Sequence, residues 1–278
     1  MSTRHAAVIG HPVTHSLSPA IHTAGFRSTG VDWDYSAIDV PPEGLAAFVS
    51  DLSRTTLHGL SVTMPHKNAI CALVDEVDAT SALLASANTV TIDETGRTRA
   101  HTTDGDGFCD ALVEAGVSID GSRFLVLGAG GAARSIVEAL VRHRAGRVGV
   151  SNRTVDTARS LVETMGEPVT LVSAGFLADE VSNSDVLVNA TNVGMGSRQT
   201  PLDCNLWRSD LVVVDIVYHP LETELLRRAR AAGCATVDGL RMLIHQAVRQ
   251  QVLWTGMRPD TTMMTEAARR ALESRPVS

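Results

Sequence analysis

The apolar residues of this 278-residue chain change their spacing near residue 105. Beyond that point, short apolar runs of strand type alternate with segments whose apolar residues recur every three or four positions, as in an amphipathic helix. The pattern predicts, in chain order, helix 106–115, strand 124–127, a helix through 136–141, strand 148–150, helix 155–165 and strands 169–172, 186–188 and 211–214. Strands that alternate with helices form a parallel, right-handed, doubly wound sheet.

The segments on either side of this region are less regular. They predict strands 6–9, 33–40, 59–63 and 89–92, helices 20–28, 45–52 and 73–86, a hairpin turn at 94–96, and two final helices, 242–254 and 263–272. We therefore predict an α/β protein of two domains. A substrate-binding domain of residues 1–104 is completed by the C-terminal helices of residues 241–278, and residues 105–240 form a Rossmann-type, doubly wound nucleotide domain. Ligands are expected in the cleft between them, at the carboxyl ends of the strands.

A glycine-rich turn joins the predicted strand 124–127 to the next helix. Residues 128–133 read Gly-Ala-Gly-Gly-Ala-Ala, the G-x-G-x-x-A pattern of dinucleotide-binding turns. Gly128 permits the tight turn, Gly130 lets the backbone approach a pyrophosphate, and Ala133 lets the helix pack close to the strand. The helix N-terminus then faces the anion.

The loop after strand 148–150 bears on which nicotinamide cofactor binds. An NAD site usually has Asp or Glu here, about 20 residues past the glycines, to accept from the ribose 2′-hydroxyl. This chain has no acid there and instead reads Ser151-Asn152-Arg153-Thr154. The Arg153 guanidinium suits a 2′-phosphate, so we predict NADP, although a solvated loop arginine is the alternative interpretation.

Composition excludes several classes of function. The chain carries a net charge of −7 with its basic residues scattered, which argues against nucleic acid as a partner. The apolar runs are far shorter than the roughly 20 residues of a membrane helix, and no signal peptide is expected. The four widely spaced cysteines, Cys71, Cys109, Cys204 and Cys234, are typical of reduced thiols in a cytoplasmic protein.

Four polar clusters lie at predicted strand ends, and three of them have a structural alternative. Ser16 and Ser18 can donate to a carboxylate, or Ser18 caps a helix that has Pro19 at its first position. Lys67 follows strand 59–63, where an exposed lysine at a helix start is also common. Asn88 follows helix 73–86. Asp104 precedes a glycine, where aspartate most often forms a turn or caps a helix.

Together these clusters resemble the shikimate dehydrogenases. The order H-S-x-S-P, S-V-T-x-P-x-K, A-N-T, T-D-G, G-A-G-G-A-A, N-R-T and M-L-x-x-Q-A runs from His15 to Trp254, over nearly the whole chain. The resemblance implies a monomeric or homodimeric enzyme that reduces 3-dehydroshikimate to shikimate with NADPH, reversibly, as a step of aromatic amino acid biosynthesis.

The resemblance also implies roles for individual residues. Lys67 and Asp104 correspond to the catalytic pair. The expected substrate contacts are Ser16, Ser18, Thr63, Asn88, Tyr218 and Gln246. The expected cofactor contacts are Gly128, Ala129, Gly130, Gly131, Ala132, Asn152, Arg153, Thr154, Thr191, Ile216 and Gly239.

The chemistry of these residues agrees with that reaction. Hydride transfer to a ketone leaves an alkoxide that needs a proton; a lysine ammonium can donate it, and the amine can remove it in the reverse direction. A carboxylate beside the lysine would hold it in place. No metal is expected, because the ten histidines show no ligand spacing.

Three alternatives remain open. The segment Glu222-Thr223-Glu224 looks more like the quinate/shikimate branch of the family, so quinate, or an amino analogue of shikimate, is one alternative substrate. Thr157 stands where NADP-specific members often have a second arginine, which leaves NAD open, with Arg159 as a possible substitute. A nucleotide-binding regulator that has lost turnover is the third, and the presence of both Lys67 and Asp104 argues against it.

Overall fold

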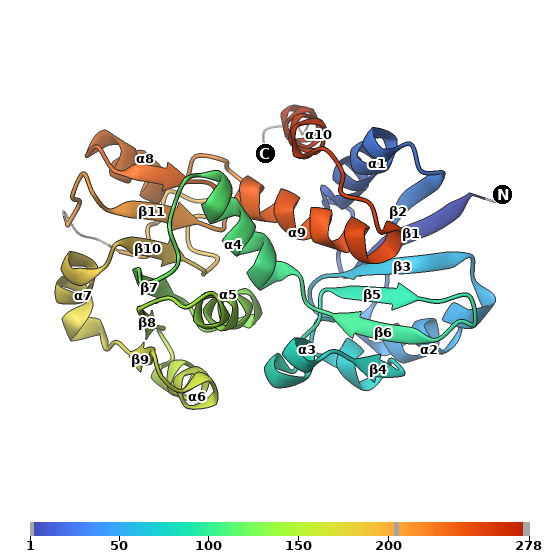
Figure 1. The fold of residues 1–278 in the computed structure, drawn as a ribbon, viewed down its shortest axis with the longest axis horizontal. Helices are drawn as coiled ribbons and strands as arrows, with labels where there is room; N and C mark the ends of the chain where they lie inside the picture. Colours follow the sequence, from blue (N-terminus) through green and yellow to red (C-terminus); the bar gives the residue numbers. More distant parts are fainter. Residues whose placement is uncertain (1–2, 203–205, 275–278) are drawn as a thin grey trace. The chain divides into compact units, whose positions relative to one another are not determined.

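The computed structural model describes residues 3–202 and 206–274. It divides into two compact units (Figure 1). The first runs up to Thr103 and includes the chain from Ile244 onward, and the second is Asp104–Leu243.

The second unit is built on a six-stranded sheet of order β12-β11-β10-β7-β8-β9, in which every pair is parallel. The strands are β7 Arg123–Leu127, β8 Arg147–Ser151, β9 Val169–Leu171, β10 Val186–Asn189, β11 Val212–Asp215 and β12 Ala235–Val237. The helices are α4 Asp104–Glu114, α5 Gly131–Arg142, α6 Val155–Met165, α7 Leu177–Asn183 and α8 Glu224–Ala231.

Helices cover both faces of this sheet. Successive side chains of a strand point to opposite faces, so one strand contributes to an apolar cluster on each side. In β7, Phe124 and Val126 pack in one apolar cluster with residues of α4, α5 and α6. Leu125 and Leu127 pack in another, with residues of α7 and α8. The predicted doubly wound parallel fold is confirmed.

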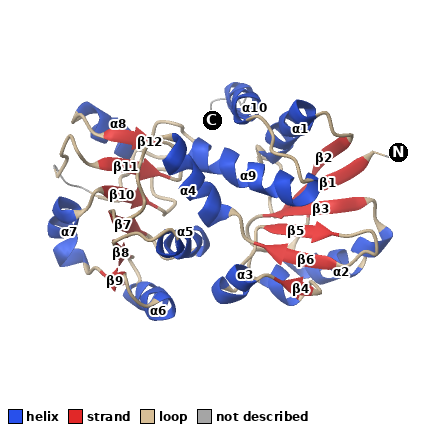
Figure 2. Cartoon of the chain, viewed as in Figure 1, coloured by secondary structure: helices blue, strands red, loops and turns tan. Residues whose placement is uncertain are grey.

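The first unit is built on a mixed six-stranded sheet of order β2-β1-β3-β5-β6-β4 (Figure 2). Its strands are β1 Arg4–Gly10, β2 Trp33–Asp39, β3 Leu57–Val62, β4 Glu76–Val77, β5 Thr89–Ile92 and β6 Thr98–His101. The helices are α1 Ser18–Thr29, α2 Leu45–Ser50, α3 Ala79–Leu84, α9 Gly239–Thr255 and α10 Thr261–Glu273, and the first residues of α9 belong to the second unit. Ala7 and Ile9 of β1 face the cluster that contains α2, whereas Ala6 packs on Phe26 of α1 and Trp254 of α9.

The predicted helix 73–86 is wrong. The chain forms a short 3-10 helix, Ala69–Ala72, then strand β4 and finally α3. Two carboxylates hold the extended stretch: Asp75 accepts from the backbone and hydroxyl of Thr98, both at 2.8 Å, and Asp78 caps α3 by accepting from the Ser81 N–H at 2.6 Å. Aspartates that bond to backbone groups compete with helix formation. The other predicted strands and helices form, all but one within three residues of their predicted limits; α5 begins at Gly131, five residues before the predicted 136–141.

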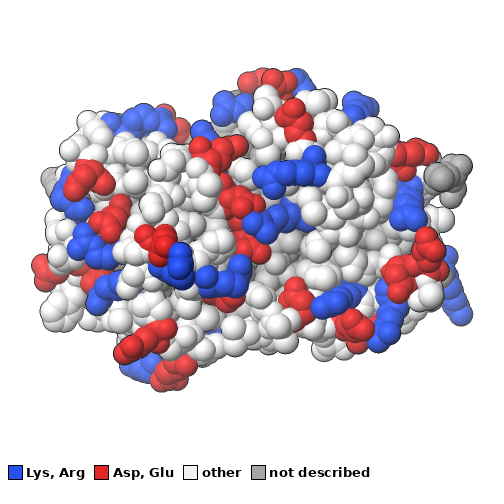
Figure 3. All heavy atoms as spheres, in the orientation of Figure 1, with Lys and Arg blue, Asp and Glu red and all other residues white. Residues whose placement is uncertain are grey.

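Charged side chains of both signs are interspersed on the face shown in Figure 3. The described part of the chain contains no helix that is long and apolar enough to cross a membrane.

Candidate functional site

The glycine turn of the second unit has the geometry of an anion-binding loop. Gly128 has φ +118°, and a Cβ there would meet the Ala190 carbonyl oxygen at 2.7 Å, so only glycine fits. Gly130 is the N-cap of α5, and a Cβ on it would lie in open space. The backbone at the start of α5 is therefore open to a ligand phosphate, and the helix N-terminus favours that negative charge.

The loop after β8 lies against this turn, because the Gly128 N–H donates to the Ser151 carbonyl at 2.7 Å. Asn152 shapes the loop by donating from its side chain to the Thr154 carbonyl at 2.9 Å. Arg153 is exposed. The first acid after it, Asp156 on α6, pairs with Arg159 at 2.5 Å, so Arg159 is already engaged with a carboxylate.

The remaining cofactor candidates lie at the carboxyl ends of neighbouring strands. The Thr191 N–H and hydroxyl both donate to Asn189 Oδ1, at 3.1 and 2.7 Å. A Cβ on Gly239 would lie 2.2 Å from the Ile216 carbonyl oxygen, so glycine permits the close approach that brings Gly239 beside Ile216. Tyr218 is half-buried just beyond β11.

A buried carboxylate organises these loops. Asp215, at the end of β11, accepts from Asn189 at 2.9 Å, from the Val217 N–H at 3.0 Å and from the Thr223 hydroxyl at 2.7 Å. Burial raises the pKa of Asp215, and these hydrogen bonds oppose the rise. Thr223 also caps α8 by accepting from the Leu226 N–H. The segment that suggested a quinate-type relative therefore holds a helix cap and an anchor for Asp215.

In the first unit, the two predicted carboxylate ligands sit at the start of α1. Ser16 Oγ accepts from the Ser18 N–H at 3.2 Å. Ser18 is the first residue of the helix and Leu17 is its N-cap, so the interpretation of Ser18 as the cap is wrong. Burial raises the pKa of Tyr35, whose hydroxyl is hydrogen-bonded to the side chains of Ser61 and Ser18.

Thr63 and Lys67 lie in one turn beyond β3. The Thr63 N–H donates to the Ile9 carbonyl at 2.9 Å, and the Lys67 carbonyl accepts from the Ala87 N–H at 2.8 Å. The buried His66 ring lies 2.6 Å from the Val40 carbonyl. Lys67 is half-buried, so it is not an exposed helix-start residue. It is the only lysine of the chain.

Asn88 and Gln246 are directly hydrogen-bonded, from Asn88 Nδ2 to Gln246 Oε1 at 3.2 Å. Thr103 joins them: its N–H donates to Asn88 Oδ1 at 2.8 Å, and its hydroxyl donates to the Gln246 carbonyl at 3.1 Å. All three side chains are buried. The next residue, Asp104, is also buried and begins α4, so it belongs to the second unit, as Tyr218 does.

Sequence reasoning missed several members of the cluster in the first unit. Tyr35, Ser61, His22 and Gln250 join Ser18 and Asn88 through buried hydrogen bonds. No local motif marks them, although Ser61 lies in the S-V-T-x-P-x-K segment.

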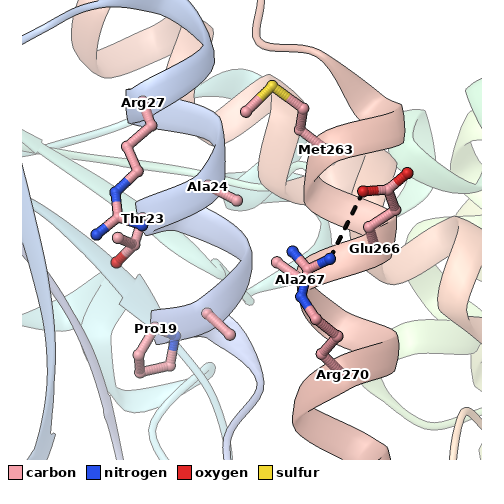
Figure 4. Close-up of a pocket in the computed structure, with 9 residues that line it drawn as sticks. Pro19, Thr23, Ala24, Arg27, Met263, Glu266, Ala267 and Arg270 are labelled. Carbon is pink, nitrogen blue, oxygen red and sulfur yellow. Dashed lines mark ion pairs between the residues drawn. The ribbon is translucent and has the colours of Figure 1, made fainter.

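The metal-ligating residue types, the cysteines and one groove of the described residues add no candidate to this site. No group of three or more His, Cys, Asp or Glu side chains is placed to hold a metal within residues 3–202 and 206–274. Cys71, Cys109 and Cys234 carry reduced thiols, and Cys204 lies outside the described residues. A groove of about 490 Å³ between α1 and α10 is lined by Arg27 and by Glu266, which pairs with Arg270 at 3.6 Å (Figure 4); none of the predicted site residues lines it.

These features define a two-unit α/β protein with a dinucleotide-type turn in one unit and a buried hydroxyl–amide cluster in the other. Family models agree: the shikimate dehydrogenase substrate-binding domain matches residues 8–90, shikimate/quinate 5-dehydrogenase matches 111–216, and the shikimate 5′-dehydrogenase C-terminal domain matches 239–269.

Known proteins match over almost the full chain. Shikimate dehydrogenase (NADP(+)) of Thermococcus kodakarensis is 44% identical over 266 residues, which cover 96% of each chain. The structure of Thermus thermophilus shikimate 5-dehydrogenase in complex with NADP(H) and shikimate is 39% identical, has a TM-score of 0.89, and the match covers 96% of this chain and 99% of that one. The structure of quinate dehydrogenase of Corynebacterium glutamicum in complex with NAD is 34% identical and has a TM-score of 0.89. The match covers 95% of this chain and 98% of that one. This chain belongs to the shikimate dehydrogenase family.

Proposed function

We propose that this protein is an oxidoreductase that interconverts 3-dehydroshikimate and shikimate with NADP(H). The observation that carries the proposal is the buried cluster of Asn88, Thr103 and Gln246, because it presents fixed amides and hydroxyls suited to a polyol ring. Relatives named as NADP-dependent shikimate dehydrogenases, and a similar structure that contains NADP(H) and shikimate, support it.

The second unit is proposed to hold the cofactor. The open backbone at Gly130 and the α5 N-terminus suit the pyrophosphate, and exposed Arg153 suits the 2′-phosphate. Thr191, Ile216 and Gly239 would line the remainder of the site. When bound, the nicotinamide supplies a hydride in one direction and takes it up in the other.

The first unit is proposed to bind the substrate. Ser16 Oγ accepts from the Ser18 N–H, which leaves the Ser16 hydroxyl hydrogen to donate to a carboxylate. Thr63, Asn88 and Gln246 would bind the ring hydroxyls, with Tyr218 of the second unit also a substrate contact.

Proton transfer is assigned to Lys67, with Asp104 as its partner. In reduction, the Lys67 ammonium donates a proton to the oxygen that becomes the new hydroxyl. In oxidation, the neutral amine removes that proton as the C–H hydride leaves. The Asp104 carboxylate would accept from the substrate hydroxyl.

Quinate with NAD is the second candidate, since the quinate dehydrogenase structure in complex with NAD is 34% identical. Quinate has a tetrahedral C1 with an extra hydroxyl, which would need a partner beside Ser16 and Ser18. A buried, unpaired hydroxyl costs about 1–3 kcal/mol, so we expect kcat/KM for quinate to be up to about a hundredfold lower.

One experiment tests both candidates. Initial rates, followed by the absorbance of the reduced nicotinamide, are measured for shikimate and quinate, each with NADP and NAD. The highest kcat/KM is expected for shikimate with NADP. A kcat/KM for quinate at or above that for shikimate would favour the second candidate, and no turnover with any pair would favour a nucleotide-binding regulator.

We also propose a cytoplasmic monomer or homodimer; a cytoplasmic location is in keeping with the reduced thiols of Cys71, Cys109 and Cys234. Light scattering of the purified protein would measure the oligomeric state.

A further inference from the structure

Gln250 lies at the centre of the buried network in the first unit, on α9. Its Oε1 accepts from the Ser61 hydroxyl at 2.8 Å and lies 3.0 Å from His22 Nε2. Its Nε2 donates to the Asn88 carbonyl and to Thr89 Oγ1, both at 3.0 Å. Gln250 is 1% exposed, so bulk water does not compete for these bonds.

The direction of these bonds is determined by His22. Burial lowers the pKa of this imidazole to about 3, so the ring is neutral. Gln251 Nε2 lies 3.1 Å from His22 Nδ1 and can only donate to it, so the proton is on Nε2 and points at Gln250 Oε1. The Gln250 amide therefore has its oxygen toward His22 and Ser61 and its nitrogen toward Asn88 and Thr89.

That orientation passes to the Asn88 side chain. Because Thr89 Oγ1 accepts from Gln250, its own hydrogen goes to Asn88 Oδ1, 2.9 Å away. The Thr103 N–H donates to the same oxygen at 2.8 Å. With Oδ1 held by two donors, Asn88 Nδ2 is directed at Gln246 Oε1 and Thr103 Oγ1, at 3.2 and 3.0 Å.

We propose that Gln250 is a positioning residue for the substrate site. It acts through Thr89 and Asn88 and fixes which end of the Asn88 amide faces the ring hydroxyls. The inference rests on the proposed function, because it takes Asn88 and Gln246 as substrate contacts. Without the Gln250 donor, the Thr89 hydroxyl can turn away from Asn88 Oδ1. Only the Thr103 N–H then holds that oxygen, and the Asn88 amide is less firmly oriented.

The test is a cycle of Gln250→Met, Thr89→Val and the double variant, with kcat and KM measured for shikimate and NADP. For Gln250→Met we expect the KM for shikimate to rise about tenfold to a hundredfold, as when a hydrogen-bond partner is misoriented. The KM for NADP and kcat should change much less. Thr89→Val should raise the KM for shikimate about three- to tenfold, and the double variant should be no worse than Gln250→Met, because both act on one path.

Thr98→Val is the matched control. Thr98 is buried in the same unit, and its hydroxyl donates to Asp75 Oδ2 at 2.8 Å, apart from the bonds of Gln250. Its loss should lower the melting temperature and leave the KM for shikimate unchanged.

Several outcomes would overturn the inference. They are an unchanged KM for shikimate in Gln250→Met, equal losses for shikimate and NADP, or additive effects in the double variant. If Gln250→Met does not fold, an unchanged KM in Thr89→Val decides against it. Failure of the proposed function is distinguishable, because the wild-type protein would then not turn over shikimate at all.

Discussion

Lys67 offers an unusually clean test of the catalytic assignment, because it is the only lysine in the chain. We expect Lys67→Ala to lower kcat by roughly 10²–10⁴, the usual range for a lost general acid or base, with a much smaller change in KM. Steady-state rates with shikimate and NADP measure both. A near-normal kcat with a raised KM would make Lys67 a binding residue.

The single lysine also permits a chemical control on the wild-type protein. Reductive methylation with ¹³C-formaldehyde labels only Lys67 and the α-amino group, so one lysine resonance should appear and should vanish in Lys67→Ala. If that resonance does not respond to saturating shikimate, Lys67 lies away from the bound substrate.

In our proposal, Arg153 gives the protein its preference for NADP over NAD. Arg153→Ala should weaken NADP binding by about 1–3 kcal/mol and leave NAD binding nearly unchanged, since a charge-assisted bond to the 2′-phosphate is lost. Titration of each cofactor against the variant measures this. Arg159→Ala is the control, because Arg159 is paired with Asp156; equal losses of NADP and NAD in Arg153→Ala would contradict the role of Arg153.

Residue identities could be read from the sequence only where a local motif marks them. The glycine turn was predictable, since its residues are consecutive and each glycine has a backbone reason. Tyr35 and Gln250 were not, because Gln250 meets Ser61 across 189 positions, and only the folded sheet and helix α9 bring them together.

At the scale of elements, Gly105 shows how a turn-like motif can be a packing motif. Glycine after Asp104 resembles a turn, yet it lies in the first turn of α4, where a Cβ would be 2.1 Å from the Ser135 carbonyl oxygen of α5. Gly105→Ala should lower the free energy of unfolding by at least about 2 kcal/mol, because overpacking two helices outweighs the gain of about 1 kcal/mol in helix propensity.

Urea denaturation measures this difference, with Gly175→Ala as the matched control. A Cβ on Gly175 meets nothing within 4 Å, so that variant should be neutral or slightly more stable. Equal stability of Gly105→Ala and the wild type would show that α4 can shift away from α5 at little cost.

His22, at the contact of α1 with α9, makes the stability of the folded protein depend on pH. The folded pKa of about 3 lies below the usual 6.5, so below pH 6.5 the unfolded chain takes up a proton that the folded protein does not. The contribution of neutral His22 to the free energy of unfolding is fully present above pH 6.5. It decreases by about 1.4 kcal/mol per pH unit as the pH falls toward 3. His22→Gln should show a correspondingly shallower fall in urea-denaturation experiments between pH 6.5 and 4; parallel curves would mean that His22 is protonated in the folded state.

Helices and strands were predictable where apolar spacing was regular, and the one predicted helix that does not form has a local cause. In residues 73–86 the apolar spacing fits a helix, but Asp75 and Asp78 bond to backbone groups and favour the extended β4. Helices α7 and α8 were missed because they are short, and α8 is rich in arginine.

At the scale of the whole molecule, the two units differ in how they are assembled from the chain. The second unit is continuous in sequence, whereas the first combines the N-terminal part with the chain from Ile244 onward. The apolar pattern predicts a discontinuous first domain, because the strand–helix alternation stops near Gly239. Hydrogen exchange tests which ligand each unit binds.

We expect NADP alone to slow amide exchange chiefly at the glycine turn 128–133 and the loop 152–154. Shikimate alone should slow exchange chiefly at Asn88, Thr103 and Gln246. The effect can reach about 100-fold at a ligand concentration 100 times the Kd, the limit that mass action sets. Mass spectrometry of peptides from the free, NADP-bound and shikimate-bound protein measures it, and Arg153→Ala with NADP serves as a control that should lose most protection at 152–154. If shikimate alone protected the glycine turn as strongly as NADP does, the assignment of the two ligands to separate units would be wrong.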